Sequence, residues 1–295
     1  MARYSVTMIA GAALLVALAL LSITYGQTDI PLATVASALS GGLSGADLAP
    51  MERIVFELRT PRALFAAIIG AGLGIVGVVL QSTTRNDLAD PFLFGLSAGA
   101  AAGAVFVITV TGDVLGLWTL PLAAFAGGLV ASAIVLALVQ ALRTEAPEKL
   151  ILAGLAVSFL FAAITNYLIF AGDSRAAHSI VFWMLGGLGL ARWDSLPIVL
   201  AGFTLIAAVA YHRRRWLDAL LAGDVTAASL GVPVKRLRMG LFLVAALATA
   251  AFVSVSGIIG FIGLMVPHLA RGLVGPLHTR LIPMAALIRA TISDA

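Results

Sequence analysis

The sequence has no cysteine among its 295 residues, which excludes disulfide bonds, thiolate metal sites and cysteine nucleophiles. It is also poor in charge, because only 11% of its residues are charged, whereas soluble domains have about 25%. By contrast, 61% of the residues are hydrophobic, and the mean hydropathy is +1.08. This balance is typical of a polytopic membrane protein rather than a soluble domain.

Lysine is nearly absent, since only Lys149 and Lys235 occur. No G-x-x-x-x-G-K-[ST] motif is present, so the chain has no P-loop with which to use ATP. Each of the 14 acidic residues falls in an expected loop or at a helix end, whereas proton-coupled carriers usually need an intramembrane carboxylate or histidine. The histidines lack a helical H-x-x-x-H spacing. We therefore expect no enzyme activity, no metal site and no cofactor bound by this chain.

Long apolar runs predict an all-α bundle of transmembrane helices, because about 20 residues cross a bilayer. The first run, Tyr4 to Thr28, is expected to be a span, with a signal peptide as the alternative. The run 239–270 is too long for one crossing and is expected to break near Ser254, Ser256 and Gly257. Segment 176–191, with Trp183, is predicted to be an amphipathic or partly inserted helix. The other runs are 63–84, 92–112, 114–142, 150–172, 195–211 and a last one from Leu281.

The basic residues predict the orientation. With the N-terminus in the cytoplasm, most lysines and arginines fall in cytoplasmic loops, as the positive-inside rule requires. Residues 212–238 are then cytoplasmic and residues 27–58 lie on the opposite side. The net charge of +4 is explained by this bias, so we expect a lipid bilayer and no nucleic acid as partner.

Small residues recur at helical spacing in two neighbouring runs. Gly95, Gly99 and Gly103 lie four residues apart, and so do Gly70 and Gly74. Such ridges let helix backbones approach closely. We expect helix packing here, and a glycine-lined ligand channel is the alternative.

The longest polar interruption in the second half is 211–239, which is basic at both ends. Asp224 is expected to cap a second short helix that Gly231 ends. We interpret the segment as a helical elbow that offers apolar residues to a partner, although an ordinary loop would also fit. Because the chain lacks a nucleotide site, the expected partner is a separate ATPase. The coupling residues are expected to be Leu217, Asp218, Leu220, Leu221, Gly223, Asp224, Ala227, Leu230 and Gly231.

Three ordered motifs resemble the permease subunits of ABC importers for ferric siderophores, haem and vitamin B12, the FecCD type. They are RTPR at 59–62, a segment from the glycine-rich helix through RNDLADP at 85–91, and GIIGFIGLMVPHLAR at 257–271. The resemblance runs from about residue 50 to the end of the chain. Its motif positions are Gln81, Asn86, Asp90, Pro91, Gly95, Gly99, Gly263, Pro267, His268 and Arg271.

The resemblance implies a single permease domain over residues 1–295, with a ten-helix type II importer fold. It also implies a second permease subunit, two ATPases that carry ATP and magnesium, and a periplasmic binding protein. The expected location is a bacterial inner membrane, and the expected cargo is a ferric chelate, with haem or cobalamin as alternatives. From other classes, a proton-coupled carrier or a non-transporting membrane scaffold remains possible on the sequence alone.

Site residues are also implied by the resemblance. Arg59 and Arg62 match arginines that pair with acidic residues of the binding protein, and a generic interfacial anchor is the alternative. The turn that holds Thr144 and Glu145 matches a cytoplasmic gate. The next helix is expected to line the pathway with Ser158, Asn166 and Tyr167, although Asn166 could instead bond to a neighbouring helix.

The chain departs from the family pattern in two places. Asp87 stands where the family usually has proline, which is expected to loosen that cytoplasmic turn. The chain also ends at Ala295, where the family continues into a tenth helix, and Arg289 stands near a position that is usually small. We therefore expect about nine helices, with the tenth missing.

Overall fold

The computed structural model describes residues 2–26, 28–141, 147–173, 176–260 and 262–294, and in these ranges the regular elements are all helical. The all-α prediction is confirmed. The helices are α1 (Ala2–Thr24), α2 (Leu32–Ser44), α3 (Pro50–Ile54), α4 (Thr60–Thr84), α5 (Leu96–Phe106), α6 (Thr119–Ala141), α7 (Pro147–Ala171), α8 (Ala176–Met184), α9 (Leu196–His212), α10 (Arg214–Leu221), α11 (Asp224–Ser229), α12 (Val234–Ser256), α13 (Ile262–Val274) and α14 (His278–Asp294).

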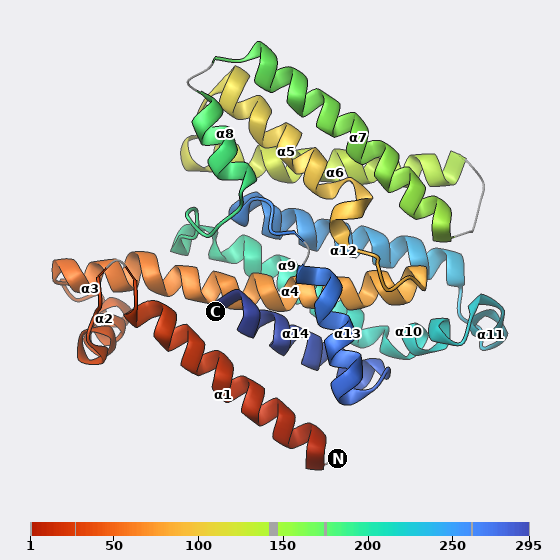
Figure 1. Cartoon of the computed structure of the whole chain (residues 1–295), viewed down its shortest axis with the longest axis horizontal. Coiled ribbons are helices and arrows are strands. Elements are labelled where there is room, and N and C mark those ends of the chain that lie inside the picture. Colours follow the sequence, from red (N-terminus) through yellow and green to blue (C-terminus); the bar gives the residue numbers. More distant parts are fainter. Residues whose placement is uncertain (1, 27, 142–146, 174–175, 261, 295) are drawn as a thin grey trace.

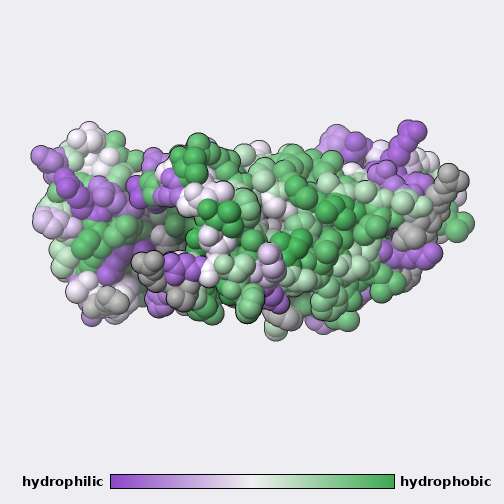
Figure 2. Space-filling view, turned by 90° about the horizontal axis from the view of Figure 1, so that it is seen from above, coloured by the Kyte–Doolittle hydropathy of each residue, from purple (hydrophilic) through white to green (hydrophobic). Residues whose placement is uncertain are grey.

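Six helical segments of the described chain are long and apolar enough to cross a membrane. They are Tyr4–Thr24, Pro50–Thr84, Gly116–Ala141, Lys149–Ala171, Trp193–His212 and Val234–Ser256. The shorter helices α5, α13 and α14 occupy the remaining expected positions. Figure 2 shows a broad hydrophobic middle between hydrophilic ends, as expected for a molecule whose middle lies in lipid.

Helix α4 runs through the centre of the molecule and packs against α14, α9 and α12 (Figure 1). Its glycine ridge faces α14. A Cβ added at Gly74 would lie 2.6 Å from the carbonyl oxygen of Ala285, and one added at Gly70 would lie 2.8 Å from that of Arg289. The backbones therefore approach too closely for any larger side chain, and the packing prediction is confirmed here.

Helices α5, α6 and α7 lie side by side and form one flank of the bundle (Figure 1). A Cβ at Gly99 or Gly103 would collide with the carbonyl oxygens of Gly127 and Ala123 in α6. This second ridge is thus also a helix-packing surface and not a ligand channel.

The break expected in the run 239–270 is present. Helix α12 ends at Ser256, and Gly257 adopts a positive φ of 64° that glycine tolerates. The backbone amide of Gly187 donates a hydrogen bond to the carbonyl of Ser256 at 2.8 Å. Trp183 of α8 is buried against the same region, at 7% exposure. Ile180 and Trp183 are the buried residues of α8, and its remaining side chains stay accessible. The helix therefore covers this break with one face, which fits the predicted amphipathic, partly inserted helix.

The polar segments gather at two opposite ends of the bundle. Helices α2 and α3 lie at one end, while α10, α11 and the N-terminus lie at the other (Figure 1). The guanidinium of Arg280, at the start of α14, lies 5.8 Å from the centre of the Tyr4 ring. The N-terminus and the elbow therefore share one side, as the orientation prediction requires.

Candidate functional site

The elbow consists of the two short helices α10 and α11, as the sequence predicted. Leu217, Leu220 and Ala227 are fully buried in the bundle's own core. Among the predicted coupling residues, Leu221 and Leu230 are the exposed leucines, at 41% and 68% exposure. The expectation that Leu220 itself meets a partner does not fit its burial, because no part of it remains accessible.

Val225 is the most exposed apolar residue of the elbow, at 86%. Val225 was not predicted from the sequence, because a valine in a short polar helix gives no periodic signal. Together with Leu221 and Leu230, Val225 forms a set of exposed apolar side chains at the polar end of the bundle, which we call the coupling face. Three exposed apolar side chains on one short elbow make it a candidate contact surface for another protein.

A first clamp holds α10 to the transmembrane bundle. Asp218 Oδ1 lies 2.7 Å from Nδ1 of His278 and accepts a hydrogen bond from the His278 backbone amide at 2.9 Å. The other ring nitrogen of His278 lies 2.7 Å from the hydroxyl of Ser82 in α4. Burial lowers the pKa of His278, while its hydrogen bond to Asp218 acts in the opposite direction. The clamp thus joins the elbow to α4 and α14.

A second clamp holds α11. Nη2 of the buried Arg238 donates to both carboxylate oxygens of Asp224 at 3.1 Å, and its Nε donates to the carbonyl of Thr83 at 2.9 Å. Arg85 Nε lies 3.8 Å from the same carboxylate. The prediction that Asp224 caps α11 is wrong, since Gly223 occupies the cap position and no side-chain cap bond forms. The Asp224 carboxylate is engaged by the arginines instead.

Two glycines shape the elbow. Gly231 follows α11 with a φ of +79°, a left-handed conformation typical of a glycine after a helix, which confirms that it ends this helix. Gly223, between α10 and α11, has a φ of +104°. Residues other than glycine are strained at such φ values. These two glycines therefore determine how α10, α11 and α12 are oriented relative to one another.

A cavity of about 390 Å³ lies between α5, α7 and the α12–α13 connection. Of the predicted pathway residues, Ser158 and Asn166 line it. Tyr167 is 69% exposed and is not among the lining residues. The gate candidates Thr144 and Glu145 lie outside the described residues.

Acidic and hydroxyl groups also border this cavity. Asp90 lies in the connection between α4 and α5, as the sequence predicted, yet it is buried, with only 3% of its surface exposed. In the part of the chain that the structure describes, Asp90 Oδ2 and Ser97 Oγ have no hydrogen-bond partner. Arg289, fully buried in α14, attracts Asp90 electrostatically. The bundle interior is therefore less free of charge than the sequence predicted.

The remaining motif residues around the 85–91 turn are structural. Gln81 donates a hydrogen bond to the carbonyl of Leu264 in α13 at 3.3 Å. Asn86 and Asp90 each accept a bond from the backbone amide two residues ahead, and Pro91 opens the next turn. Gly95 has a φ of +79° at the start of α5.

The turn at Asp87, which was predicted to be loose, makes an ion pair with α13. Arg271 Nη1 donates to Asp87 Oδ1 at 2.8 Å and ties this turn to α13. Pro267 is buried within α13 while His268 is exposed. Gly263 belongs to the first turn of the same helix. The carboxylate that replaces the family's proline therefore adds a link between two segments of the polar end.

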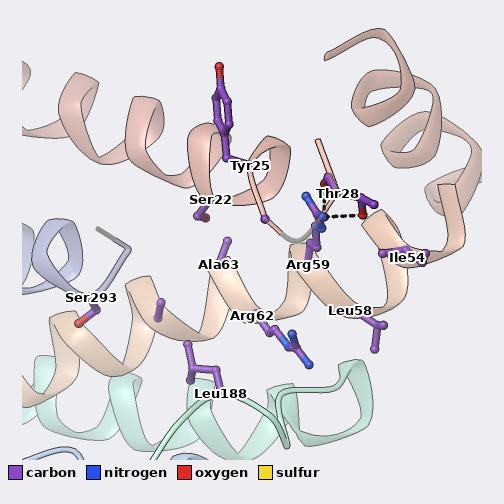
Figure 3. A pocket seen from close by; sticks show the side chains of 12 residues that line it. Ser22, Tyr25, Thr28, Ile54, Leu58, Arg59, Arg62, Ala63, Leu188 and Ser293 are labelled. Atoms are coloured by element: carbon purple, nitrogen blue, oxygen red, sulfur yellow. Dashed lines mark hydrogen bonds between the residues drawn. The ribbon is translucent and has the colours of Figure 1, made fainter. Parts of the chain in front are cut away.

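The predicted docking arginines behave differently from one another. Arg59, just before α4, donates to the carbonyl of Ile23 in α1 at 2.8 Å and to that of Thr28 at 2.6 Å. Its guanidinium therefore joins the start of α4 to the end of α1 and to the segment after it, and Figure 3 shows the contact with Thr28. Arg62 is exposed. Both line a cavity of about 560 Å³ at this end of the bundle, which Figure 3 shows. Arg62 is thus available for an outside carboxylate, whereas Arg59 serves the fold.

Comparison with known proteins decides the family. The profile of the FecCD transport family matches residues 14–293. The chain belongs to the FecCD transport family. It is a permease subunit of an ABC importer, and ATP is hydrolysed by a separate subunit of such importers. As a member it is a multi-pass membrane protein that works with an ATPase and a binding protein.

Individual relatives cover most of the chain. It is 38% identical to the "Cobalamin import system permease protein BtuC" of Halobacterium salinarum, over 94% of this chain and 84% of the relative. It is 36% identical to the "Hemin transport system permease protein HmuU" of Yersinia pestis, over 80% of this chain and 72% of the relative. A solved structure described as an inward-facing conformation of a metal-chelate type ABC transporter superposes with a TM-score of 0.84. The identity is 30%, and the match covers 98% of this chain and 88% of that one.

Proposed function

We propose that this permease carries a ferric chelate of the siderophore type from a periplasmic binding protein to the cytoplasm. The observation that carries the proposal is the cavity between α5 and α7, which Ser158 and Asn166 line among mainly apolar neighbours. A wall of this kind suits a bulky chelate held by many weak contacts rather than by one charged group. The likeness to a metal-chelate type transporter supports the same class.

Haem or cobalamin is the second candidate cargo, because named relatives at 36% and 38% identity import hemin and cobalamin. All three cargoes are metal chelates, so one assay distinguishes them. Proteoliposomes that contain the permease, its ATPase and its binding protein are supplied with radiolabelled ferric siderophores, haem or cobalamin. ATP-dependent uptake of the ferric chelates alone supports the proposal, and uptake of cobalamin or haem alone contradicts it.

In the proposed assembly two permeases face one another through α7. Its outer face carries the exposed side chains Leu152, Phe159 and Tyr167, together with Phe170 at 89% exposure. An apolar stripe on a membrane helix meets either lipid or another helix, and we place the second permease here because the stripe adjoins the cavity. The pathway then lies beside α7, where the cavity opens. A homodimer is the expected arrangement, and no cofactor is bound by the permease itself.

The coupling face points toward the ATPase in this proposal, with the elbow on the cytoplasmic side. Exposed Arg62 lies at the opposite end, where the binding protein carries acidic residues that arginine recognises bidentately. The clamps at Asp218 and Asp224 transmit movement of the elbow to α4, α12 and α14. The gate is expected near Thr144 and Glu145.

A further inference from the structure

A third cavity, of about 350 Å³, lies outside the pathway, where α9, α10 and α12 meet. Its polar rim is formed by Arg213, Trp216 and Arg236. Its inner wall is formed by apolar residues from the last turns of α9 and the first turns of α12. None of the coupling-face residues borders it. We call this cavity the basic groove.

The rim combines two cations with an aromatic ring. The Arg213 guanidinium lies 4.2 Å from the centre of the Trp216 ring, which holds it in place. Arg236 is exposed at the start of α12. Among the described residues neither arginine forms an ion pair with a carboxylate. Arg238, two residues further along, differs because Asp224 neutralises it.

The wall of the groove is apolar and extends toward the hydrophobic middle of the molecule. Leu237 and Leu241 are buried, while Val209 and Val244 are partly exposed. Gly240 is exposed, and a Cβ added there would meet nothing within 4 Å. The groove is thus open along α12 for about two turns below the arginines.

We propose that the basic groove binds an anionic phospholipid. The phosphate lies between Arg213 and Arg236, and one acyl chain runs along Gly240 toward Val244. Basic pockets between membrane helices at the cytoplasmic end are suited to acidic headgroups, and tryptophan prefers the headgroup level. A soluble anion would use the arginines and leave the apolar wall uncovered. The joint presence of both surfaces in one groove favours a lipid.

The position of the groove gives the lipid a role in coupling. Both ends of the elbow border the groove: Arg213 lies where α9 leads into α10, and Arg236 lies at the start of α12, after α11. A lipid that bridges Arg213 and Arg236 would link these two ends and restrict their separation. Anionic lipid is therefore expected to stabilise the assembled importer and to strengthen ligand-stimulated ATP hydrolysis. The role in coupling rests on the proposed function, whereas lipid binding can be measured without transport.

The test uses the assembled importer and native mass spectrometry in detergent, with phosphatidylglycerol, phosphatidylcholine or inorganic phosphate added. Wild type is expected to retain phosphatidylglycerol in preference to phosphatidylcholine. Arg213→Gln with Arg236→Gln should lower the apparent affinity for phosphatidylglycerol at least about tenfold. The matched control is Arg214→Gln with Arg215→Gln, which removes the same charge from the same segment outside the groove.

A second pair of variants tests the apolar wall. Gly240→Leu fills the groove without touching the arginines and should also lower phosphatidylglycerol retention. Gly272→Leu is its control, because Gly272 is equally open but lies in α13. Melting temperatures in phosphatidylcholine report whether each variant is folded. The proposal would be overturned if both arginine pairs lost the same amount of phosphatidylglycerol, or if Gly240→Leu lost none. It would also be overturned if inorganic phosphate alone bound the groove as well as phosphatidylglycerol does.

Discussion

Replacing Leu220 and Leu221 one at a time separates the folding of the elbow from its recognition by the ATPase. The two residues are neighbours in α10 with the same side chain. Leu220 is fully buried, whereas Leu221 is 41% exposed. The same change to alanine should therefore lower the stability of the permease at Leu220 and its affinity for the ATPase at Leu221.

The magnitudes follow from burial. Leu220→Ala removes a fully buried side chain and should lower the free energy of unfolding by about 2–5 kcal/mol. Full burial of a leucine contributes about 1.5–3 kcal/mol, and only the exposed two fifths of Leu221 are left for a partner to cover. Leu221→Ala should thus weaken ATPase binding by roughly 0.6–1.2 kcal/mol, about three- to eightfold. Leu221→Asp should cost about tenfold or more, because a carboxylate would be buried in the interface.

Two assays distinguish these outcomes. Thermal unfolding of the permease in lipid nanodiscs measures stability, and surface-immobilised ATPase measures the affinity. Leu220→Ala should melt earlier yet bind the ATPase normally while folded, and Leu221→Asp should melt like wild type and bind weakly. Normal ATPase binding and normal ligand-stimulated hydrolysis with Leu221→Asp would refute the assignment of the coupling face.

Three further predictions follow from single residues. Arg62→Glu should slow capture of the binding protein at low salt, while Arg59→Gln should mainly lower the melting temperature; equal association rates in stopped-flow measurements for Arg62→Glu and wild type would contradict this. Below about pH 6.5 the ring of unfolded His278 gains a proton that the buried folded ring resists, so stability should fall as the pH falls from about 6.5 to the lowered folded pKa and should level off below it. In His278→Gln the melting temperature should fall less steeply below about pH 6.5 than in wild type. An equally steep fall in the variant would show that His278 does not cause it. Gly231→Val strains a φ of +79° and should uncouple hydrolysis from uptake while the ATPase still binds; wild-type uptake per ATP would argue against it.

Most of the helical layout could be predicted from the sequence, because it depends on local hydrophobicity. The break at Ser256–Gly257 and the two short helices of the elbow follow from composition and from glycine placement. Helix α2, which lies between the first two long apolar runs, was not predicted. Its short apolar pattern is too weak to stand out beside the long runs.

The clamps could not be predicted, because their members lie far apart in the chain. Asp218 and His278 are 60 residues apart, and Arg238 reaches Thr83 across 155 residues. Asp224 illustrates the difficulty, since an acid at a helix start is a standard capping signal. A buried arginine from another segment binds its carboxylate more strongly than the local amides do.

Residues that look equivalent in the sequence also differ in how deeply the structure buries them. Arg59 and Arg62 occur in one motif, yet one binds backbone carbonyls and the other is exposed. Leu217 and Leu220 fill the core, whereas Leu230 and Val225 are exposed. A periodic pattern identifies the apolar face of a short helix, but it does not say whether that face meets its own bundle or another protein.

Transport by this permease is proposed to be driven by a separate ATPase that acts on its elbow. The most direct measurement is ATP-driven uptake of a ferric chelate into proteoliposomes, with the permease, ATPase and loaded binding protein present, and with Leu221→Asp as the variant. We predict uptake that requires all three components and that falls about tenfold or more with Leu221→Asp at limiting ATPase. Uptake that persists without the ATPase, or that is unchanged by Leu221→Asp, would contradict the account.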